Sequence, residues 1–332
     1  MNMYDCDSVK KIALPVCVLH ILQKYSDAEH IMQMQEILEK LESEYLLKVD
    51  RRTVYQSVHE LKNLGYGISD YSKNKKGYFL ETRDLEKSEV RLLMDAVYSC
   101  QAISACQSKN LIGKLQKAFL SVYDRNQYKN LMLIRTNKKT QNTDVFTNIQ
   151  QLDEALAKKK KVKFTYLEYG LNKKLKPRRP EKYTVNPHQL ICTNEHYYLI
   201  CRLEGCANLS LYRVDLIKDL EVTDDLAYSD LAPRELQSAE NKTVYAWCGK
   251  EETVTLRCKR LSLGHVIDKF GDDVTIIPEG KDFFIATFKV APVGVSFWAL
   301  QYLPYVEVLA PEWLRQEVIQ SIKDNPYTES MK

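Results

Sequence analysis

The spacing of the apolar residues changes near residue 161 of the 332-residue chain, and this change limits the possible folds more than any other feature. Before residue 158, apolar residues recur at the spacing of amphipathic helices. From residue 161 they alternate with polar residues, as in "KVKFTYLEY". A chain of this length has room for two or three domains. The sequence therefore predicts an α+β multidomain protein, with helices first and small sheets afterwards.

Composition excludes several other classes of protein. The chain is 45% hydrophobic and 28% charged, as in ordinary soluble proteins. No stretch approaches the roughly 18 uninterrupted apolar residues of a membrane span. The start, "MNMYDCDSVKK", has acids where a signal peptide has basic residues, so we expect a cytoplasmic protein. The nine cysteines form no C-x-x-C pair, and we interpret them as reduced thiols without a metal site.

Three helices are expected within residues 1–83. The first two lie in 10–27 and 31–45, with Pro15 near the first turn of the first helix. Asp50 is a candidate cap for the third helix, and Gly65 is its expected end. One face of the third helix carries the apolar residues Val54, Val58, Leu61 and Leu64.

The remaining face of the third helix carries the candidate DNA-binding residues Arg51, Arg52, Thr53, Tyr55 and Gln56. A hairpin is expected after Gly65, with three further DNA-binding candidates at its polar tip: Lys73, Lys75 and Lys76. Residues 48–83 contain eight basic and four acidic side chains. Together these features predict a winged helix-turn-helix DNA-binding domain. The alternative is a small helical domain that binds protein or has no binding function.

The segment "VDRRTVYQSVHELKNLGYGI" is similar to the recognition helix of a known family. It resembles the helix-turn-helix transcriptional regulators whose C-terminal half is a WYL domain. The similarity is dense over about twenty residues and implies that the third helix enters a DNA groove.

Residues 84–145 are expected to form a helical connector. Asp84 is a possible cap for a first helix, and a second follows in 107–123. The segment 135–144 has no apolar residue and is predicted to be a linker. Helices in this position most often form a dimer interface or a lever.

A small β-barrel is expected in residues 146–228. A helix is followed by five short strands, which favours a Sm- or SH3-like barrel. The segment "GLNKKLKPRRPEK" is predicted to be a basic loop between the first two strands. Residues 156–182 contain eleven basic and two acidic side chains, a local net charge of +9 that suits an anionic partner.

This region resembles the WYL domain itself. Tyr197, Tyr198 and Leu199 occupy the Trp-Tyr-Leu position, with Tyr in place of Trp. The "YRVDLI" strand also matches the family pattern, although Leu216 replaces an Arg. The resemblance implies a sensor of nucleotides or nucleic-acid fragments, with the candidate ligand-binding residues Tyr166, His188, Tyr198, Arg202 and Arg213. The alternatives are that the tyrosines belong to the core and that Arg213 pairs with Asp215.

Residues 243–325 predict a ferredoxin-like domain. Strands and helices follow in the order βαββαβ, with Pro311 at the start of the last helix. The stretch "FWALQYLPYVEVLAPEWLRQEV" resembles the C-terminal extension that accompanies WYL domains. Trp298 is expected to anchor packing, and Arg257 is a further candidate for ligand binding.

The sequence thus predicts a cytoplasmic transcription regulator without enzymatic activity or a cofactor. We expect it to bind double-stranded DNA as a homodimer, with a ligand sensor in the WYL domain for an anionic effector such as a nucleotide or single-stranded nucleic acid. G-x-G-x-x-G, P-loop and G-x-S-x-G motifs are all absent from the sequence. Two alternatives remain: a nucleic-acid-processing enzyme or its accessory subunit, and a protein-interaction adaptor.

Overall fold

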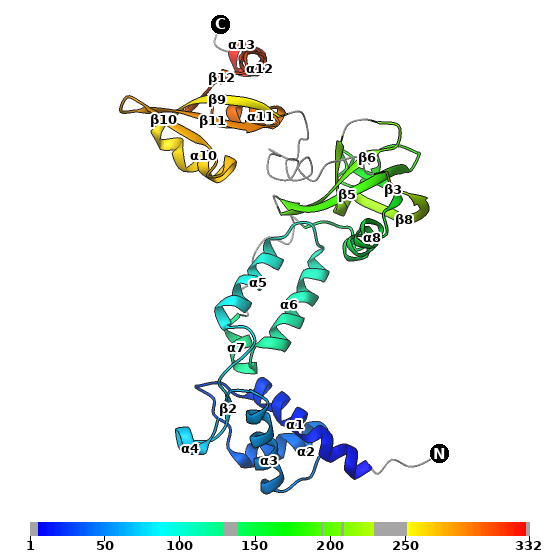
Figure 1. Ribbon diagram of the computed structural model, residues 1–332, viewed down its shortest axis with the longest axis vertical. Helices are drawn as coiled ribbons and strands as arrows, with labels where there is room; N and C mark the ends of the chain where they lie inside the picture. The colour runs from blue at the N-terminus through cyan, green and yellow to red at the C-terminus, as the bar shows by residue number, and fades with distance from the viewer. Residues whose placement is uncertain (1–5, 129–138, 194, 207–208, 229–250, 330–332) are drawn as a thin grey trace. The chain divides into compact units, whose positions relative to one another are not determined.

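The computed structural model describes residues 6–128, 139–193, 195–206, 209–228 and 251–329. The chain folds into two compact units, residues 1–141 and 142–332 (Figure 1). No helix in these described ranges is long and apolar enough to cross a membrane.

The first unit begins with three helices, α1 (Cys6–Tyr25), α2 (Met34–Tyr45) and α3 (Arg51–Asn63). Their shared core contains the buried residues Leu14, Val18, Leu22, Ile37, Leu41, Val54, Val58 and Leu61. The helix α1 begins at Cys6, so Pro15 lies inside it and not near its first turn. That prediction was wrong because the helix extends further toward the N-terminus than its apolar residues indicate.

Both predicted ends of α3 are confirmed. Oδ1 of Asp50 accepts the backbone N–H of Thr53 at 2.8 Å and its hydroxyl at 2.9 Å. Gly65 has φ +94°, a conformation that glycine adopts without strain. Leu64 is 74% exposed, however, because the helix ends at Asn63 and the chain turns away from the apolar face.

The predicted hairpin is present but shorter than expected. Strands β1 (Ile68–Ser69) and β2 (Phe79–Leu80) pair antiparallel, and a helical turn, α4 (Tyr71–Asn74), replaces the simple polar tip. The hairpin is also tied to the chain before α2, since Met32 and Tyr78 form a β-bridge. A Cβ on Gly77 would lie 2.2 Å from the carbonyl oxygen of Met32, so this close approach requires glycine.

The connector consists of α5 (Lys87–Ser99), α6 (Ala105–Phe119) and the short α7 (Val122–Gln127). The N-cap of α5 is Glu86, with Glu89 completing a capping box, so the prediction for Asp84 was wrong. Ser104 and Ser121 cap α6 and α7. The buried core between α5 and α6 is small: Val90, Met94, Ile112 and Leu120.

The second unit begins with α8 (Val145–Ala157), which packs on a six-stranded antiparallel sheet. The strands are β3 (Lys160–Tyr169), β4 (Leu175–Pro177), β5 (Tyr183–Thr193), β6 (His196–Leu203), β7 (Leu209–Arg213) and β8 (Ile217–Leu226). Their order is β4-β3-β5-β6-β7, and β8 also pairs with β3, so the sheet curls (Figure 1). A 3₁₀ turn (Val214–Leu216) joins β7 to β8. The strand β4 lies within the segment predicted as a loop.

A four-stranded antiparallel sheet follows, with the strand order β10-β11-β9-β12. Its elements are β9 (Glu252–Lys259), α10 (Leu263–Phe270), β10 (Thr275–Glu279), β11 (Phe283–Val290), α11 (Val293–Gln301), β12 (Val306–Ala310) and α12 (Glu312–Lys323), then the short α13 (Pro326–Glu329). A 3₁₀ turn (Arg260–Ser262) precedes α10. Trp298 is buried against the rings of Phe270 and Tyr302, as the sequence predicts. Pro311 directly precedes α12.

Candidate functional site

The helix α3 presents a polar face to solvent. The predicted residues Arg51, Arg52, Tyr55 and Gln56 are all exposed on it. Thr53 differs from them, because its hydroxyl donates to the capping carboxylate of Asp50. Gln56 is held along the helix by donating its amide to Glu60 at 3.0 Å. The exposed positions near the start of α3 are therefore dominated by cations and hydrogen-bonding groups.

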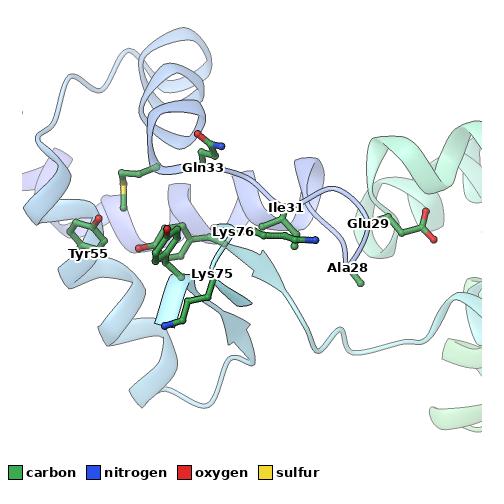
Figure 2. Close-up of a pocket in the computed structure, with 11 residues that line it drawn as sticks. Ala28, Glu29, Ile31, Gln33, Tyr55, Lys75 and Lys76 are labelled. Carbon is green, nitrogen blue, oxygen red and sulfur yellow. The ribbon is translucent and has the colours of Figure 1, made fainter. Parts of the chain in front are cut away.

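Beside this face lies a groove of about 830 Å³, which we call the wing groove (Figure 2). Its walls come from the turn before α2, from α3 and from the hairpin, and they include Glu29, Gln33, Tyr55, Tyr71, Lys75 and Lys76. Tyr55 is 51% exposed, and its ring lies 6.2 Å from that of Tyr78. Burial, together with neighbouring Tyr55, raises the pKa of Tyr78, so Tyr78 stays neutral. The groove thus offers hydroxyl, amide and ammonium groups around one cavity.

The three hairpin lysines are placed differently. Lys73 forms an ion pair with Glu81 at 2.7 Å. Lys75 and Lys76 line the wing groove, and Lys75 has a left-handed backbone with φ 58°. The cations that border the groove are therefore Lys75 and Lys76.

In the second unit, Arg213 is the centre of a cluster that also contains Asp215, His196, Tyr166 and Tyr198. Nε and Nη2 of Arg213 donate to the two carboxylate oxygens of Asp215 at 3.1 and 2.7 Å. Asp215 is fully buried, and Nδ1 of His196 lies 3.7 Å from its Oδ1. Tyr166 accepts the backbone N–H of Arg213 at 3.2 Å, and Tyr198 is the cross-strand partner of Arg213. Three predicted ligand-binding residues therefore meet here around a buried acid.

Charges in the Arg213 cluster are balanced internally. Burial acts to lower the pKa of Arg213, but the hydrogen bond to Asp215, the charge of that carboxylate and the nearby tyrosines together outweigh it and raise that pKa. Burial, and then the charge of Arg213, lowers the pKa of His196 below its ordinary value, so this imidazole is neutral at pH 7. The pairing of Arg213 with Asp215, one of the alternatives from the sequence, is the arrangement that the structure has.

Tyr166 and Tyr198 differ in their surroundings. Tyr166 is buried among Phe164, Tyr183 and Tyr212, whose rings lie 4.8 to 6.4 Å from its own. Burial raises the pKa of both Tyr166 and Tyr198. Tyr198 is only partly buried, so of the two it has the more accessible ring. Tyr166 braces the cluster from the core.

The other candidate ligand-binding residues lie elsewhere. Arg202 lines a second groove of about 550 Å³, together with Lys161, Asn186, Glu204 and Tyr228. We call this the Arg202 groove, and in it Lys161 pairs with Glu204 at 2.7 Å. His188 is in β5, where the register with β6 shifts between Pro187 and Gln189. Arg257 is in β9 of the four-stranded sheet, where it pairs with Glu279 at 2.5 Å and lies over the ring of Phe283.

Several members of these sites, among them His196 and Tyr71, were missed from the sequence. His196 lies at the start of β6, and no sequence pattern marks it as a site residue. It lies near Asp215 because β6 pairs with β7 in the folded protein. Tyr71 lines the wing groove from α4, which the sequence predicted as a plain turn. Among the described residues, no group of three or more His, Cys, Asp or Glu side chains is placed to hold a metal ion.

Two models of known protein families match the second unit, one in each half. The model of the WYL domain matches residues 147–222, which run from α8 into β8. The chain contains a WYL domain. The model of the WCX domain matches residues 250–324, which run from β9 to the end of α12. The sheet that carries the Arg213 cluster is thus the WYL domain, and the four-stranded sheet is the WCX domain.

Solved structures similar to this WYL-domain protein include the proteasome accessory factor B/C (PafBC) of Arthrobacter aurescens. That match has 15% identity and a TM-score of 0.28, and covers 92% of this chain and 47% of the PafBC chain. The chain thus spans about half of the length of PafBC. A second match is a CRISPR Cas-related protein, with 12% identity and a TM-score of 0.35, covering 100% of this chain and 89% of that one. No curated protein matches the sequence.

Proposed function

We propose that this WYL-domain protein is a transcription regulator that binds double-stranded DNA through residues 1–83. The observation that carries the proposal is the capped helix α3, which exposes Arg51, Arg52 and Gln56. Tyr55 of the same helix lines the wing groove together with Lys75 and Lys76. Arginine forks and amides suit base edges in a major groove, and lysines suit phosphates. The proposal interprets α1 to α3 and the hairpin as a winged helix-turn-helix.

We also interpret the WYL domain as a Sm- or SH3-like barrel and the WCX domain as ferredoxin-like. The curled six-stranded sheet supports the first assignment. The βαββαβ order of the WCX domain supports the second.

The proposal includes a homodimer, formed through the connector helices or an exchanged C-terminal domain. One winged helix contacts a short site, and a second copy adds a half-site about one helical turn away. The small core between α5 and α6 supports the connector as an interface, since Leu92 and Leu93 are exposed on α5. Covering such residues is a common reason for two helical hairpins to associate.

Binding of a random-sequence duplex by the full chain tests the proposal. The affinity should fall as the salt concentration rises. The slope of log affinity against log salt concentration, here called the salt slope, is set by the number of phosphates contacted. Lys75→Ala should weaken binding and reduce this slope by about one. Lys289→Ala removes the same charge from an exposed site on β11 of the WCX domain and should leave the slope unchanged. Equal slopes in the wild type and both variants would contradict the assignment of Lys75 to DNA.

The sensor part of the proposal assigns an anionic effector, a nucleotide or single-stranded nucleic acid, to the WYL domain. Its support is the local net charge of +9 in residues 156–182 and the Arg202 groove with Lys161 and Tyr228. An arginine, a lysine and an exposed aromatic ring around one groove can bind phosphate and stack on a base.

A single-stranded dT oligonucleotide of about ten nucleotides is the probe for the sensor. Arg202→Ala should weaken its binding and reduce the salt slope by about one. Arg260→Ala, an exposed arginine in the WCX domain, is the matched control. Equal binding by wild type and Arg202→Ala would exclude this groove. Cleavage of the oligonucleotide with Mg²⁺ would favour the enzyme alternative over a sensor.

A further inference from the structure

A buried polar network joins the turn before α2 to the connector, within the first unit. Its centre is the hydroxyl of Ser121, which lies 2.9 Å from Oδ2 of Asp27 and 3.0 Å from Oδ2 of Asp124. All three side chains are buried. We call these residues, with His30 and Tyr123, the Ser121 network. Since Asp27 and Ser121 are 94 residues apart, their bond is a tertiary contact between two parts of the fold.

Asp27 organises the turn on its own side of the network. Its Oδ1 accepts the backbone N–H groups of Glu29 and His30 at 2.9 and 2.8 Å, and Nδ1 of His30 lies 2.8 Å away. Burial acts to raise the pKa of Asp27, but these bonds and the one from Ser121 outweigh it and lower that pKa. Asp27 is therefore a carboxylate that holds the turn and the connector at the same time.

Two cations and a ring contact complete the junction. Arg83 donates to the carbonyl oxygens of Gln23 and Ser26, near the end of α1, and of Phe119, the last residue of α6. Lys87 pairs with Asp124 at 2.6 Å. The ring of His30 stacks on that of Tyr123, with centroids 3.6 Å apart and planes 1° apart. Hydrogen bonds, an ion pair and a ring stack thus hold the turn and the connector together.

The same turn forms part of the wing groove. Ala28, Glu29 and Ile31 line the groove, and Figure 2 shows them on the segment that leads into α2. The adjoining Met32 pairs with Tyr78 of the hairpin. A movement of the connector that displaces Asp27 or His30 therefore displaces one wall of the groove.

The hydroxyl of Ser121 has a single proton for two carboxylates. When it donates to Asp27, the turn is held to the connector; when it donates to Asp124, Oδ2 of Asp27 loses this donor. A buried bond to a charged group stabilises more than one in water, so the two states differ in how firmly the turn is held.

We propose that the connector sets the shape of the wing groove through the Ser121 network, with Ser121 and Tyr123 as positioning residues for DNA binding. Only the part of this inference that concerns DNA binding rests on the proposed function. Its structural part, the coupling of the connector to the turn, is independent of any ligand.

Hydrogen exchange of the full chain, measured by mass spectrometry, tests the coupling. Ser121→Ala should make the amides of Glu29 and His30 exchange about tenfold faster, because their acceptor Asp27 loses its tie to the connector. Ser108→Ala is the matched control. Ser108 is also a buried connector serine, but its hydroxyl donates to the backbone carbonyl of Ser104, within α6.

Unchanged exchange at Glu29 and His30 in Ser121→Ala, or an equal increase in Ser108→Ala, would overturn the proposal. Tyr123→Leu supplies a second test if Ser121→Ala does not fold, since it removes the ring that stacks on His30 and should also speed exchange in the turn. Random-sequence duplex binding should weaken in Ser121→Ala and not in Ser108→Ala. A wild-type chain that binds no duplex would refute the proposed function, while the exchange result would still decide the coupling.

Discussion

Replacing Arg213 with alanine should destabilise the WYL domain by about 3–5 kcal/mol. The variant leaves the carboxylate of Asp215 fully buried without its two hydrogen bonds from the guanidinium. The neighbouring His196 cannot replace the lost cation at pH 7, because burial and Arg213 lower its pKa. The side chain of Arg213 is 29% exposed, so water can reach part of the site, and we expect the lower end of this range.

Calorimetric melting of the full chain without ligand measures this loss. The double variant Arg213→Ala with Asp215→Ala should be less destabilised than the sum of the two single variants, because no buried charge is left unpaired. Arg179→Ala is a control within the same domain, where the guanidinium lies 3.6 Å over the ring of Tyr183 and should contribute only about 0.5–1 kcal/mol. A melting curve of Arg213→Ala like that of the wild type would refute a bracing role.

A destabilised Arg213→Ala protein would lose ligand response for reasons unrelated to ligand contact. Arg202→Ala is therefore the better variant for testing the proposed sensor.

Arg52→Ala should weaken binding to a specific duplex by about 1–3 kcal/mol, roughly 5- to 150-fold, if the arginine reads a base. Arg52 is exposed at the second position of α3, where the N-terminal residues of a recognition helix meet base edges. The loss should be largest for the preferred sequence and small for random duplex, because phosphate contacts remain. Fluorescence anisotropy with both duplexes measures the difference.

Arg91→Ala is the matched control for Arg52→Ala. Arg91 lies on α5 in an exposed ion pair with Asp95, a pair that contributes little to stability. The control should bind both duplexes as the wild type does. An equal loss of affinity for the two duplexes in Arg52→Ala, or no loss for either duplex, as expected for Arg91→Ala, would exclude base recognition by Arg52.

Features with a local cause could be predicted from the sequence. Asp50 caps α3 and Gly65 follows its end, because both depend on residues within four positions. The strands β3 and β5 to β8 follow from alternation. The resemblances to the WYL domain and to the C-terminal extension that accompanies it agree with the family models that match those residues.

Features that depend on tertiary contacts could not be predicted in the same way. Competing caps cannot be ranked from sequence alone, so Glu86 was missed in favour of Asp84. The strand β4 forms because the C-terminal part of β3 supplies a partner, from Leu167 to Tyr169. The Ser121 network joins residues nearly a hundred positions apart, and isolated Ser and Asp residues carry no sequence signal of such a contact.

Selection of bound sequences from a random duplex pool by the full chain tests the DNA-binding account most directly. We predict an enriched site with two related half-sites about one helical turn apart, as a dimer of recognition helices requires. The enrichment should disappear in Arg52→Ala. A pool that shows no enriched sequence, from a folded wild-type chain at low salt, would contradict the account.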